Sequence, residues 1–262
     1  MLPIKRKIQV NIPFTLLYES YLELFLGNQL NPEIGLDAAA LERFSYAEFS
    51  KIAAQLHHHS LTVTFHAPFV DLAPGSTDPA VRALTRKRFE QVLQLLPLFK
   101  PQAVVCHTGY DRRRHGYLRE EWIENSLQLW SWLSQRVGDE GAVLMLENVF
   151  EEGPDDIRII FENLRTASLG FCMDTGHIFA FGIAPLATWM ESMEPYLRQL
   201  HLHDNFGRQD NHLALGHGSI DFQTLFQFLK NRKGPPPIIT LEPHTESDFW
   251  PSIEYLAKVW PW

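Results

Sequence analysis

Short apolar runs alternate with longer amphipathic stretches along the whole chain. Repeated units of this kind are typical of strands and helices arranged around a parallel sheet. The pattern predicts eight strands, at Lys7–Ile12, Pro32–Leu36, Leu61–His66, Ala103–His107, Val143–Glu147, Leu169–Asp174, Arg198–His203 and Pro237–Glu242.

Helices are predicted between most of these strands. Ser45 followed by Glu48 forms a capping box, and Asp78-Pro79 provides an N-cap with proline at the first helical position. The predicted helices are Ser45–Leu56, Asp78–Leu96, Glu120–Val137, Pro154–Asn163, Pro185–Met193, Phe222–Asn231 and Ser247–Val259.

Eight strands interleaved with helices favour a (β/α)8 TIM barrel over an open doubly wound sheet. Such a barrel typically needs about 250 residues, so we expect residues 1–262 to form one domain. In a barrel, alternate strand residues face the interior. Glu147 then faces the interior with Met145, whereas Leu144 and Leu146 face the helices. We expect the active site at the C-terminal mouth.

Composition narrows the class of protein without naming a substrate. The net charge of −8 gives no overall signal for nucleic-acid binding. Cys106 and Cys172 are the two cysteines, and both lie in apolar runs, which favours a reducing compartment over a disulfide scaffold. No run approaches the roughly 20 apolar residues of a membrane span. We therefore expect a cytoplasmic protein without membrane partners.

Nine potential metal ligands occur at matching places in the predicted barrel. Seven lie at or just past the carboxyl end of a predicted strand, and two share the loop after the seventh strand. The nine are His66, His107, Glu147, Asp174, His177, His201, Asp210, His212 and Glu242.

One such residue alone is more often an ordinary polar residue of the rim. Here six successive strands deliver one each to the same mouth, where bare carboxylates would repel one another. Cations are the simplest compensation, and histidine with carboxylate is a ligand mixture for Zn, Mn or Fe. The sequence therefore predicts a metal centre.

The combined motifs resemble the xylose isomerase-like TIM barrel superfamily, which includes sugar phosphate isomerases and epimerases and the endonuclease IV-type enzymes of AP endonuclease family 2. The resemblance runs from the third strand to the C-terminus. It is carried by His66-Ala67-Pro68, Leu146-Glu147-Asn148, Asp174-Thr175-Gly176-His177, His201-Leu202-His203-Asp204, Asp210-Asn211-His212 and Leu241-Glu242.

The resemblance implies one to three divalent ions (Zn, Mn, Mg or Co) in three sub-sites. Glu147, Asp174, His201 and Glu242 match the site shared by most of the superfamily. His66 and His107, with Glu147 bridging, match a second metal site. The third match consists of His177, Asp210 and His212. Candidate substrate contacts are His203, Arg208 and Asn148; for His203, a solvated rim residue is an equally good interpretation.

Two reactions suit such a centre. The first is isomerisation or epimerisation of a sugar or sugar phosphate through an enediolate, with Glu147 and Glu242 exchanging a C–H proton as base and acid. The second is hydrolysis of phosphodiesters at abasic DNA sites, the only one that requires a nucleic-acid partner. A third alternative is a barrel that binds a metal or ligand without turnover. The sequence does not specify the oligomeric state.

Two local features bear on this choice. Arg112-Arg113-Arg114 is the one basic run on a predicted βα loop, and it suits either a phosphate or a solvated loop. The nuclease branch of the resembled family tends to have tyrosine shortly after the first ligand histidine, where this chain has Phe69. The first function that we expect is therefore the isomerase or epimerase.

Overall fold

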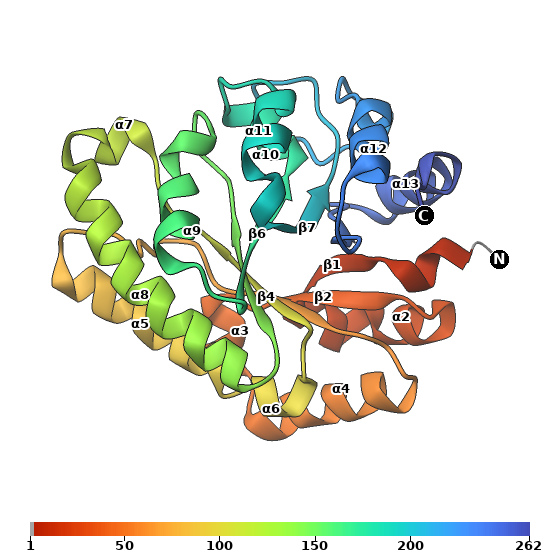
Figure 1. Ribbon diagram of the computed structural model, residues 1–262. Coiled ribbons are helices and arrows are strands. Elements are labelled where there is room, and N and C mark those ends of the chain that lie inside the picture. The colour runs from red at the N-terminus through yellow and green to blue at the C-terminus, as the bar shows by residue number, and fades with distance from the viewer. Residues whose placement is uncertain (1–2) are drawn as a thin grey trace.

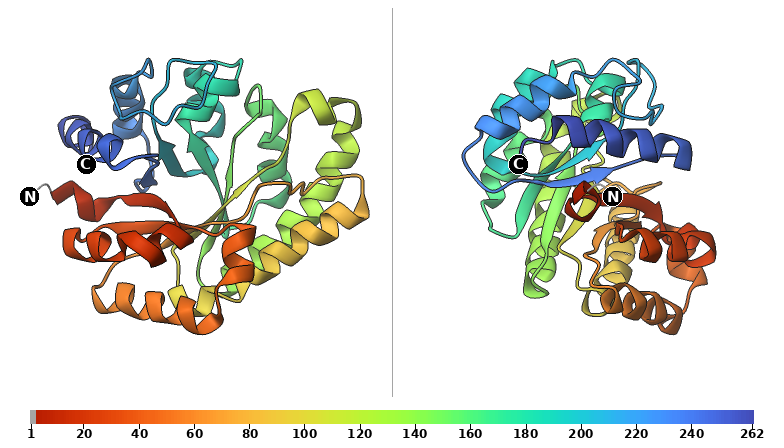
Figure 2. Two further views of the ribbon diagram at one scale, coloured as in Figure 1. Left: turned by 180° about the vertical axis from the view of Figure 1, so that it is seen from behind. Right: turned by 90° about the vertical axis from the view of Figure 1, so that its right-hand side faces the viewer.

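The computed structural model describes residues 3–262 and contains a closed barrel of parallel strands. The strands are hydrogen-bonded in chain order, and β1 pairs with β8 to close the barrel. Helices surround the strands, and the segments Pro3–Lys7 and Glu246–Val259 lie beside each other (Figure 1, Figure 2). The strands are β1 Gln9–Pro13, β2 Asn31–Gly35, β3 Thr64–His66, β4 Ala103–His107, β5 Val143–Glu147, β6 Leu169–Asp174, β7 Leu197–Leu202 and β8 Ile238–Leu241. The predicted (β/α)8 barrel is confirmed.

The helical layer is more divided than the sequence pattern predicts. Four 3-10 turns occur, at η1 Pro3–Lys7, η3 Gly116–Leu118, η4 Pro154–Asp156 and η5 Glu194–Tyr196, and η2 Leu17–Tyr21 is a π-helical segment. The α-helices are α1 Phe14–Leu16, α2 Leu22–Asn28, α3 Ala38–Arg43, α4 Tyr46–His58, α5 Pro79–Leu93, α6 Leu96–Phe99, α7 Arg112–His115, α8 Arg119–Asp139, α9 Arg158–Leu164, α10 Thr175–Phe181, α11 Leu186–Met193, α12 Phe222–Asn231 and α13 Glu246–Val259.

Local signals explain which boundaries were predicted well. The capping box of Ser45 and Glu48 is present at α4, and the Asp78 side chain caps α5 ahead of Pro79. The third strand is shorter than predicted, because the backbone N–H of Thr62 donates to the Asn31 side chain instead of joining the sheet.

Each strand has one face in the apolar core between strands and helices and the other face in the barrel interior. Leu144 and Leu146 of β5 are fully buried in the core between strands and helices, as their alternation predicts. A small apolar cluster belongs to the other face of the strands, inside the barrel, and consists of Ala103, Val105, Met145 and Cys172. Burial of the larger of these side chains, such as Leu144, Leu146 and Met145, contributes roughly 1.5–3 kcal/mol each.

Strand register brings the predicted ligands to one level of the barrel. His107 of β4 is paired with Glu147 of β5, and Asp174 of β6 is paired with His201 of β7. Because the strands are parallel and in register, their carboxyl ends form one rim. The polar residues of the rim therefore lie above the apolar cluster of the barrel interior.

Candidate metal centre

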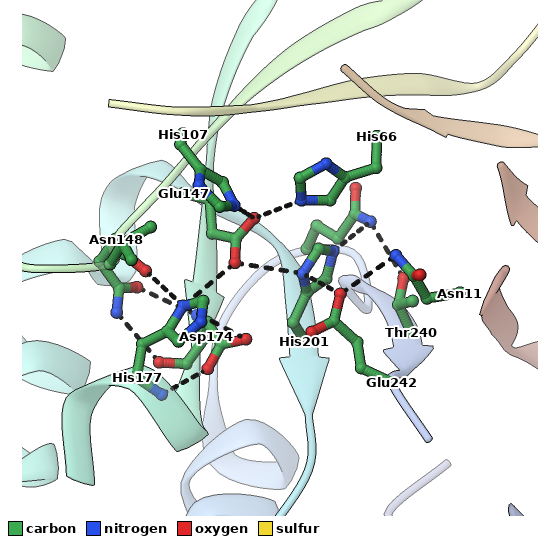
Figure 3. A network of polar contacts seen from close by, with 12 residues as sticks. Asn11, His66, His107, Glu147, Asn148, Asp174, His177, His201, Thr240 and Glu242 are labelled. Carbon is green, nitrogen blue, oxygen red and sulfur yellow. Dashed lines mark hydrogen bonds and ion pairs between the residues drawn. The ribbon is translucent and has the colours of Figure 1, made fainter. Parts of the chain in front are cut away.

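Glu147 lies at the middle of a buried group of histidines and carboxylates (Figure 3). One of its oxygens, Oε2, lies 3.2 Å from Nε2 of His66 and 3.5 Å from Nε2 of His107. The other, Oε1, lies 3.3 Å from Nδ1 of His177 and 3.4 Å from Nδ1 of His201. The residues predicted from β3 to β7 are thus brought together around a single carboxylate.

Backbone carbonyls fix the orientation of three of the histidine rings. Nδ1 of His66 lies 3.1 Å from the carbonyl of Ala67, and Nδ1 of His177 lies 3.0 Å from that of Asn148. In His212, Nδ1 lies 2.8 Å from the carbonyl of Glu242. A carbonyl only accepts, so Nδ1 donates in each ring, and in the neutral ring Nε2 is the nitrogen with a free lone pair. This is the usual arrangement of a histidine that binds a metal.

His201 has the reverse orientation because of Glu33, a residue that the sequence analysis did not identify. Nε2 of His201 donates to Oε1 of Glu33 over 2.9 Å, and both side chains are fully buried. Nδ1 of His201 is left facing Oε1 of Glu242 at 3.0 Å. Glu33 therefore selects which nitrogen of His201 is directed toward the carboxylates.

Glu33 is itself held by donors from four other strands. Its Oε2 accepts from Gln199 at 2.6 Å, from Thr64 at 2.8 Å and from Thr240 at 3.2 Å. Its Oε1 accepts from Asn11 at 3.3 Å, and Asn11 also donates to Glu242 at 3.2 Å. Burial raises the pKa of Glu33, but His201, His66 and Thr64 together outweigh burial, so the net pKa lies below the usual value and the carboxyl stays ionised.

Asp174 links two elements of the site. Its Oδ1 accepts from the backbone N–H of His177 over 2.7 Å and so caps the N-terminus of α10. The cap places His177 three residues after Asp174 on the first turn of the helix, facing the same mouth. The spacing Asp174-Thr175-Gly176-His177 thereby delivers two potential ligands from one turn.

Asn148, predicted to contact substrate, forms two hydrogen bonds with the backbone of Asp174. Its amide nitrogen donates to the carbonyl of Asp174, and its amide oxygen accepts from the backbone N–H of Asp174, both over 3.0 Å. Both ends of this buried amide are occupied by the protein. Asn148 therefore positions Asp174 and His177.

A second group of ligands lies beside the first. Nε2 of His212 lies 3.1 Å from Oδ2 of Asp210, and Nε2 of His177 lies 3.4 Å from the same oxygen. His203, predicted to contact substrate, is buried against this group, with Nε2 at 3.5 Å from Oδ1 of Asp210. Arg208 is exposed at the tip of the same loop, with a left-handed backbone (φ 67°).

The pKa values in the centre are set by two opposing effects: burial of each group, and the charges and hydrogen bonds of its neighbours. Burial raises the pKa of Glu147, but His201, His107 and His177 outweigh it and hold the pKa well below the usual range. Burial lowers the pKa of His107 to about 3, so this ring is neutral at pH 7. For His212, burial lowers the pKa, but the hydrogen bond and charge of Asp210 together with Glu242 outweigh burial, and the pKa is about 9.

Buried polar atoms without a hydrogen-bond partner fit a cation. Among the described residues these atoms include Glu147 Oε1, Asp174 Oδ2, His201 Nδ1, Asp210 Oδ1 and both ring nitrogens of His203. Unpaired burial of such groups costs several kcal/mol, and a cation among them would remove that cost. The ligand atoms also converge, because each of three groups lies within 4.8 Å: His66 with His107 and Glu147, Glu147 with Asp174 and His177, and His177 with His203, Asp210 and His212.

The donor set favours particular ions. Imidazole nitrogens and carboxylate oxygens together suit zinc, manganese or cobalt better than calcium. Cys172 lies within the same distance of Glu147 and His201, but burial raises the pKa of its thiol well above the usual value. The residues present therefore fit one or more divalent ions.

Two arginines of the basic run Arg112-Arg113-Arg114 form ion pairs with carboxylates of the same chain. Arg112 forms ion pairs with Glu152 at 3.3 Å and with the buried Asp156 at 3.1 Å, and Arg114 lies 3.4 Å from Asp111. The segment is the short helix α7 and not the predicted loop, and two of its three arginines are paired with carboxylates of the protein. The partners of Arg112 follow the next strand, about 40 residues later in the sequence.

A (β/α)8 barrel with a histidine–carboxylate centre at its carboxyl-end mouth defines a class of barrels that can hold divalent metals. The chain belongs to the xylose isomerase-like TIM barrel family, whose pattern matches residues 20–259.

Two relatives and two solved structures illustrate the match. The protein MJ1311 of Methanocaldococcus jannaschii is 27% identical over 207 residues, which cover 76% of this chain and 70% of the relative. A probable endonuclease 4 of Symbiobacterium thermophilum is 25% identical over 257 residues, covering 90% and 86%. The TTHB071 protein from Thermus thermophilus, soaked with ZnCl2, is 25% identical with a TM-score of 0.81, covering 97% and 98%. A D-tagatose 3-epimerase-like protein shares the fold, with a TM-score of 0.82, 24% identity and coverage of 97% and 96%.

Among residues 3–262, no helix combines the length and the apolar character needed to cross a membrane.

Proposed function

We propose that this protein is a divalent-metal-dependent isomerase or epimerase of a sugar or sugar phosphate. The observation that carries the proposal is the placement of two carboxylates around one imidazole. Oε1 of Glu147 and Oε1 of Glu242 lie 3.4 Å and 3.0 Å from the same Nδ1 of His201, although they come from β5 and from the end of β8. Two carboxylates on different sides of a mouth are what proton exchange on a sugar carbon requires.

Glu147 and Glu242 would act as the general base and general acid of the proton transfer. One carboxylate removes the proton from the carbon next to the carbonyl group, and the other delivers a proton to the opposite face. The low pKa of Glu147 keeps this carboxyl ionised and able to accept. A divalent ion held by Glu147, Asp174, His201 and Glu242 would polarise the substrate oxygens and stabilise the negative charge that develops on them.

Aromatic side chains at the rim support a small ring-shaped substrate. Phe69, Phe150 and Phe206 follow β3, β5 and β7, and they are 47%, 49% and 69% exposed. Phe69 also stacks on His107, with ring centroids 4.2 Å apart. Binding sites for small molecules commonly combine aromatic walls with a few polar groups. With Arg112 neutralised by Glu152 and Asp156, no basic groove emerges from the predicted basic run.

The alternative is an endonuclease IV-type nuclease, and one observation favours it. His66, His107, His177, Asp210 and His212 all gather at the centre, in the second and third groups expected for that enzyme. Several relatives that are 24–27% identical are named probable endonuclease 4. This alternative would need DNA as partner, whereas the first proposal needs only a small sugar.

Zinc is the first metal to test, because the relative from Thermus thermophilus was soaked with ZnCl2; manganese, cobalt and magnesium follow. We further propose that residues 1–262 act as one domain in the cytoplasm.

Incubation of the metal-loaded protein with a panel of ketoses and their phosphates in D2O tests the proposal. Deuterium at the carbon next to the carbonyl, with appearance of the epimer, is the expected result. Glu147→Gln should reduce exchange by about 10²–10⁴-fold, as loss of a general base does, whereas the surface variant Glu90→Gln should retain it. Incision of an abasic oligonucleotide, without exchange into any sugar, would establish the nuclease instead.

A further inference from the structure

We propose that Asn11 of β1 is a specificity-determining residue, whose amide oxygen accepts a hydrogen bond from a hydroxyl group of the substrate. The inference deepens the proposed function and rests on it only for the substrate being a polyhydroxy sugar. β1 carries none of the nine predicted ligands, but it lies between β2 and β8 in the closed barrel. Asn11 is paired with Glu33, and Val10 is paired with Leu241, the residue before Glu242. Asn11 thus has a carboxylate on each side.

The side chain of Asn11 faces the barrel interior and is reached from the mouth. Its neighbours Val10 and Ile12 are buried in the core between strands and helices, so Asn11 points to the opposite face of the strand. The next layer toward the amino ends of the strands is fully buried and includes Thr64, Gln199 and Thr240. Asn11 itself is partly exposed. Because the layer beneath it is closed, solvent reaches Asn11 through the mouth.

Both hydrogens of the Asn11 amide are directed at carboxylates. Nδ2 donates to Oε1 of Glu33 over 3.3 Å and to Oε1 of Glu242 over 3.2 Å (Figure 3). An ionised carboxylate only accepts, and the lowered pKa of Glu33 keeps it ionised. The reverse orientation of the amide would bring Oδ1 against the same two oxygens, where acceptor faces acceptor. The two carboxylates therefore fix the amide nitrogen inward and leave the amide oxygen for other partners.

The amide oxygen of Asn11 is an accessible acceptor. Among residues 3–262, the side-chain hydrogen bonds of Asn11 are the two that its nitrogen donates, and no group donates to Oδ1. Oδ1 is also absent from the buried polar atoms that lack a partner in this part of the chain, so it is in contact with solvent. An amide oxygen has two lone pairs. A substrate hydroxyl that replaces water at this place would donate to Oδ1.

This acceptor lies beside a group that would move the proton. Oε1 of Glu242, which accepts from Asn11, also lies 3.0 Å from Nδ1 of His201. A hydroxyl held by Asn11 would therefore lie next to Glu242. A sugar presents several hydroxyl donors along its carbon chain, whereas a phosphodiester group presents acceptors only. Because the nitrogen of Asn11 is already occupied, the residue favours a polyhydroxy compound over a phosphodiester group at this place.

Binding of hexitols tests the inference without turnover, because these alditols have the hydroxyls of a sugar but no carbonyl group. NMR titration of the zinc-loaded protein measures the affinity for a hexitol and for its singly deoxygenated analogues. In the unmodified protein, loss of one particular hydroxyl should weaken binding about 2–10-fold, as loss of a neutral hydrogen bond does. In Asn11→Ala, loss of the same hydroxyl should make no further difference, because its acceptor is already gone. Asn28→Ala is the matched control and should behave as the unmodified protein, since Asn28 is also partly exposed but lies on α2, outside the barrel.

The outcomes separate this inference from the proposed reaction. The same dependence on every hydroxyl in Asn11→Ala and in the unmodified protein would overturn the role of Asn11, even if sugars react. Hexitol binding that depends on Asn11, without deuterium exchange into any ketose, would uphold the inference and reject the isomerase or epimerase.

Diffraction from hexitol-soaked crystals of the unmodified protein gives a second test that does not depend on a variant folding. The expected result is a hexitol hydroxyl about 2.7–2.8 Å from Oδ1 of Asn11. A bound hexitol that leaves this oxygen to water, or no bound hexitol in the crystal and in the titration, contradicts the inference.

Discussion

Replacement of Glu33 by glutamine examines how the barrel interior orients the metal centre. Glu33 accepts from His201 over 2.9 Å and from Asn11, Thr64, Gln199 and Thr240. The variant keeps the shape of the side chain but places an NH2 group where one of these oxygens was. At least one of five inward-pointing donors then meets another donor.

Two effects of different size follow. A buried donor left without an acceptor costs about 1–3 kcal/mol of folding stability. Loss of the carboxylate that orients His201 should weaken metal binding about 10–100-fold, the range for outer-shell partners of metal ligands. That loss corresponds to about 1.4–2.8 kcal/mol, since each tenfold change is about 1.4 kcal/mol. The metal centre should therefore weaken while the barrel still folds.

Competition with a chromophoric chelator measures the metal affinity, and circular dichroism confirms the fold. Glu90→Gln is the control, since Glu90 is half exposed and pairs with Arg86 at the surface, where ion pairs contribute about 0–1 kcal/mol. A folded Glu33→Gln protein whose zinc affinity stays within threefold of the unmodified protein would refute the role assigned to Glu33.

Three further predictions concern the pH dependence of stability, the room for a side chain at Gly176, and metal removal. Burial raises the pKa of Glu151 to about 7 from 4.5. Between these two pH values the folded state holds a proton that the unfolded state releases. The free energy of unfolding should therefore fall by up to about 3 kcal/mol as pH rises from 4.5 to 7. Urea unfolding of Glu151→Gln should lack this fall, and parallel pH profiles for the two proteins would contradict it. A Cβ atom on Gly176 would lie 1.8 Å from Cε1 of His203. Gly176→Ala should therefore displace His203 and reduce bound zinc, whereas Gly27→Ala, with nothing within 4 Å of the new Cβ, should bind zinc normally; full zinc content in both would argue against this packing. Removal of metal should lower the thermal unfolding midpoint reversibly, since a ligand at 1,000 times its Kd contributes about 4 kcal/mol, and an unchanged midpoint would count against a bound metal.

The sequence predicted the parts of the molecule that follow from regular repetition. All eight strands were located, since each is a short apolar run, and residues at parallel strand ends must share one rim. The convergence of His66, Glu147 and His201 follows from that geometry alone. The helical segment Phe14–Asn28 was missed, because it begins directly after β1 without a turn signal and includes a π-helical stretch.

Residues that act through the three-dimensional arrangement could not be predicted. Glu33 is one glutamate in a predicted strand, and only the closed barrel places it against His201, 168 positions later in the numbering (201 − 33). The ion pairs of Arg112 with Glu152 and Asp156 likewise depend on how two βα loops meet. The packing of His203 against Gly176 and His212 likewise becomes visible only in the fold.

Elemental analysis of protein purified without chelator tests the central claim, that the histidine and carboxylate groups hold divalent metal. Glu147 belongs both to the group with His66 and His107 and to the group with Asp174 and His177. The unmodified protein and Glu90→Gln should therefore contain at least one tightly held ion per chain, and folded Glu147→Gln should contain less. Equal metal content in all three proteins, or none in any of them after zinc is supplied, would contradict the account.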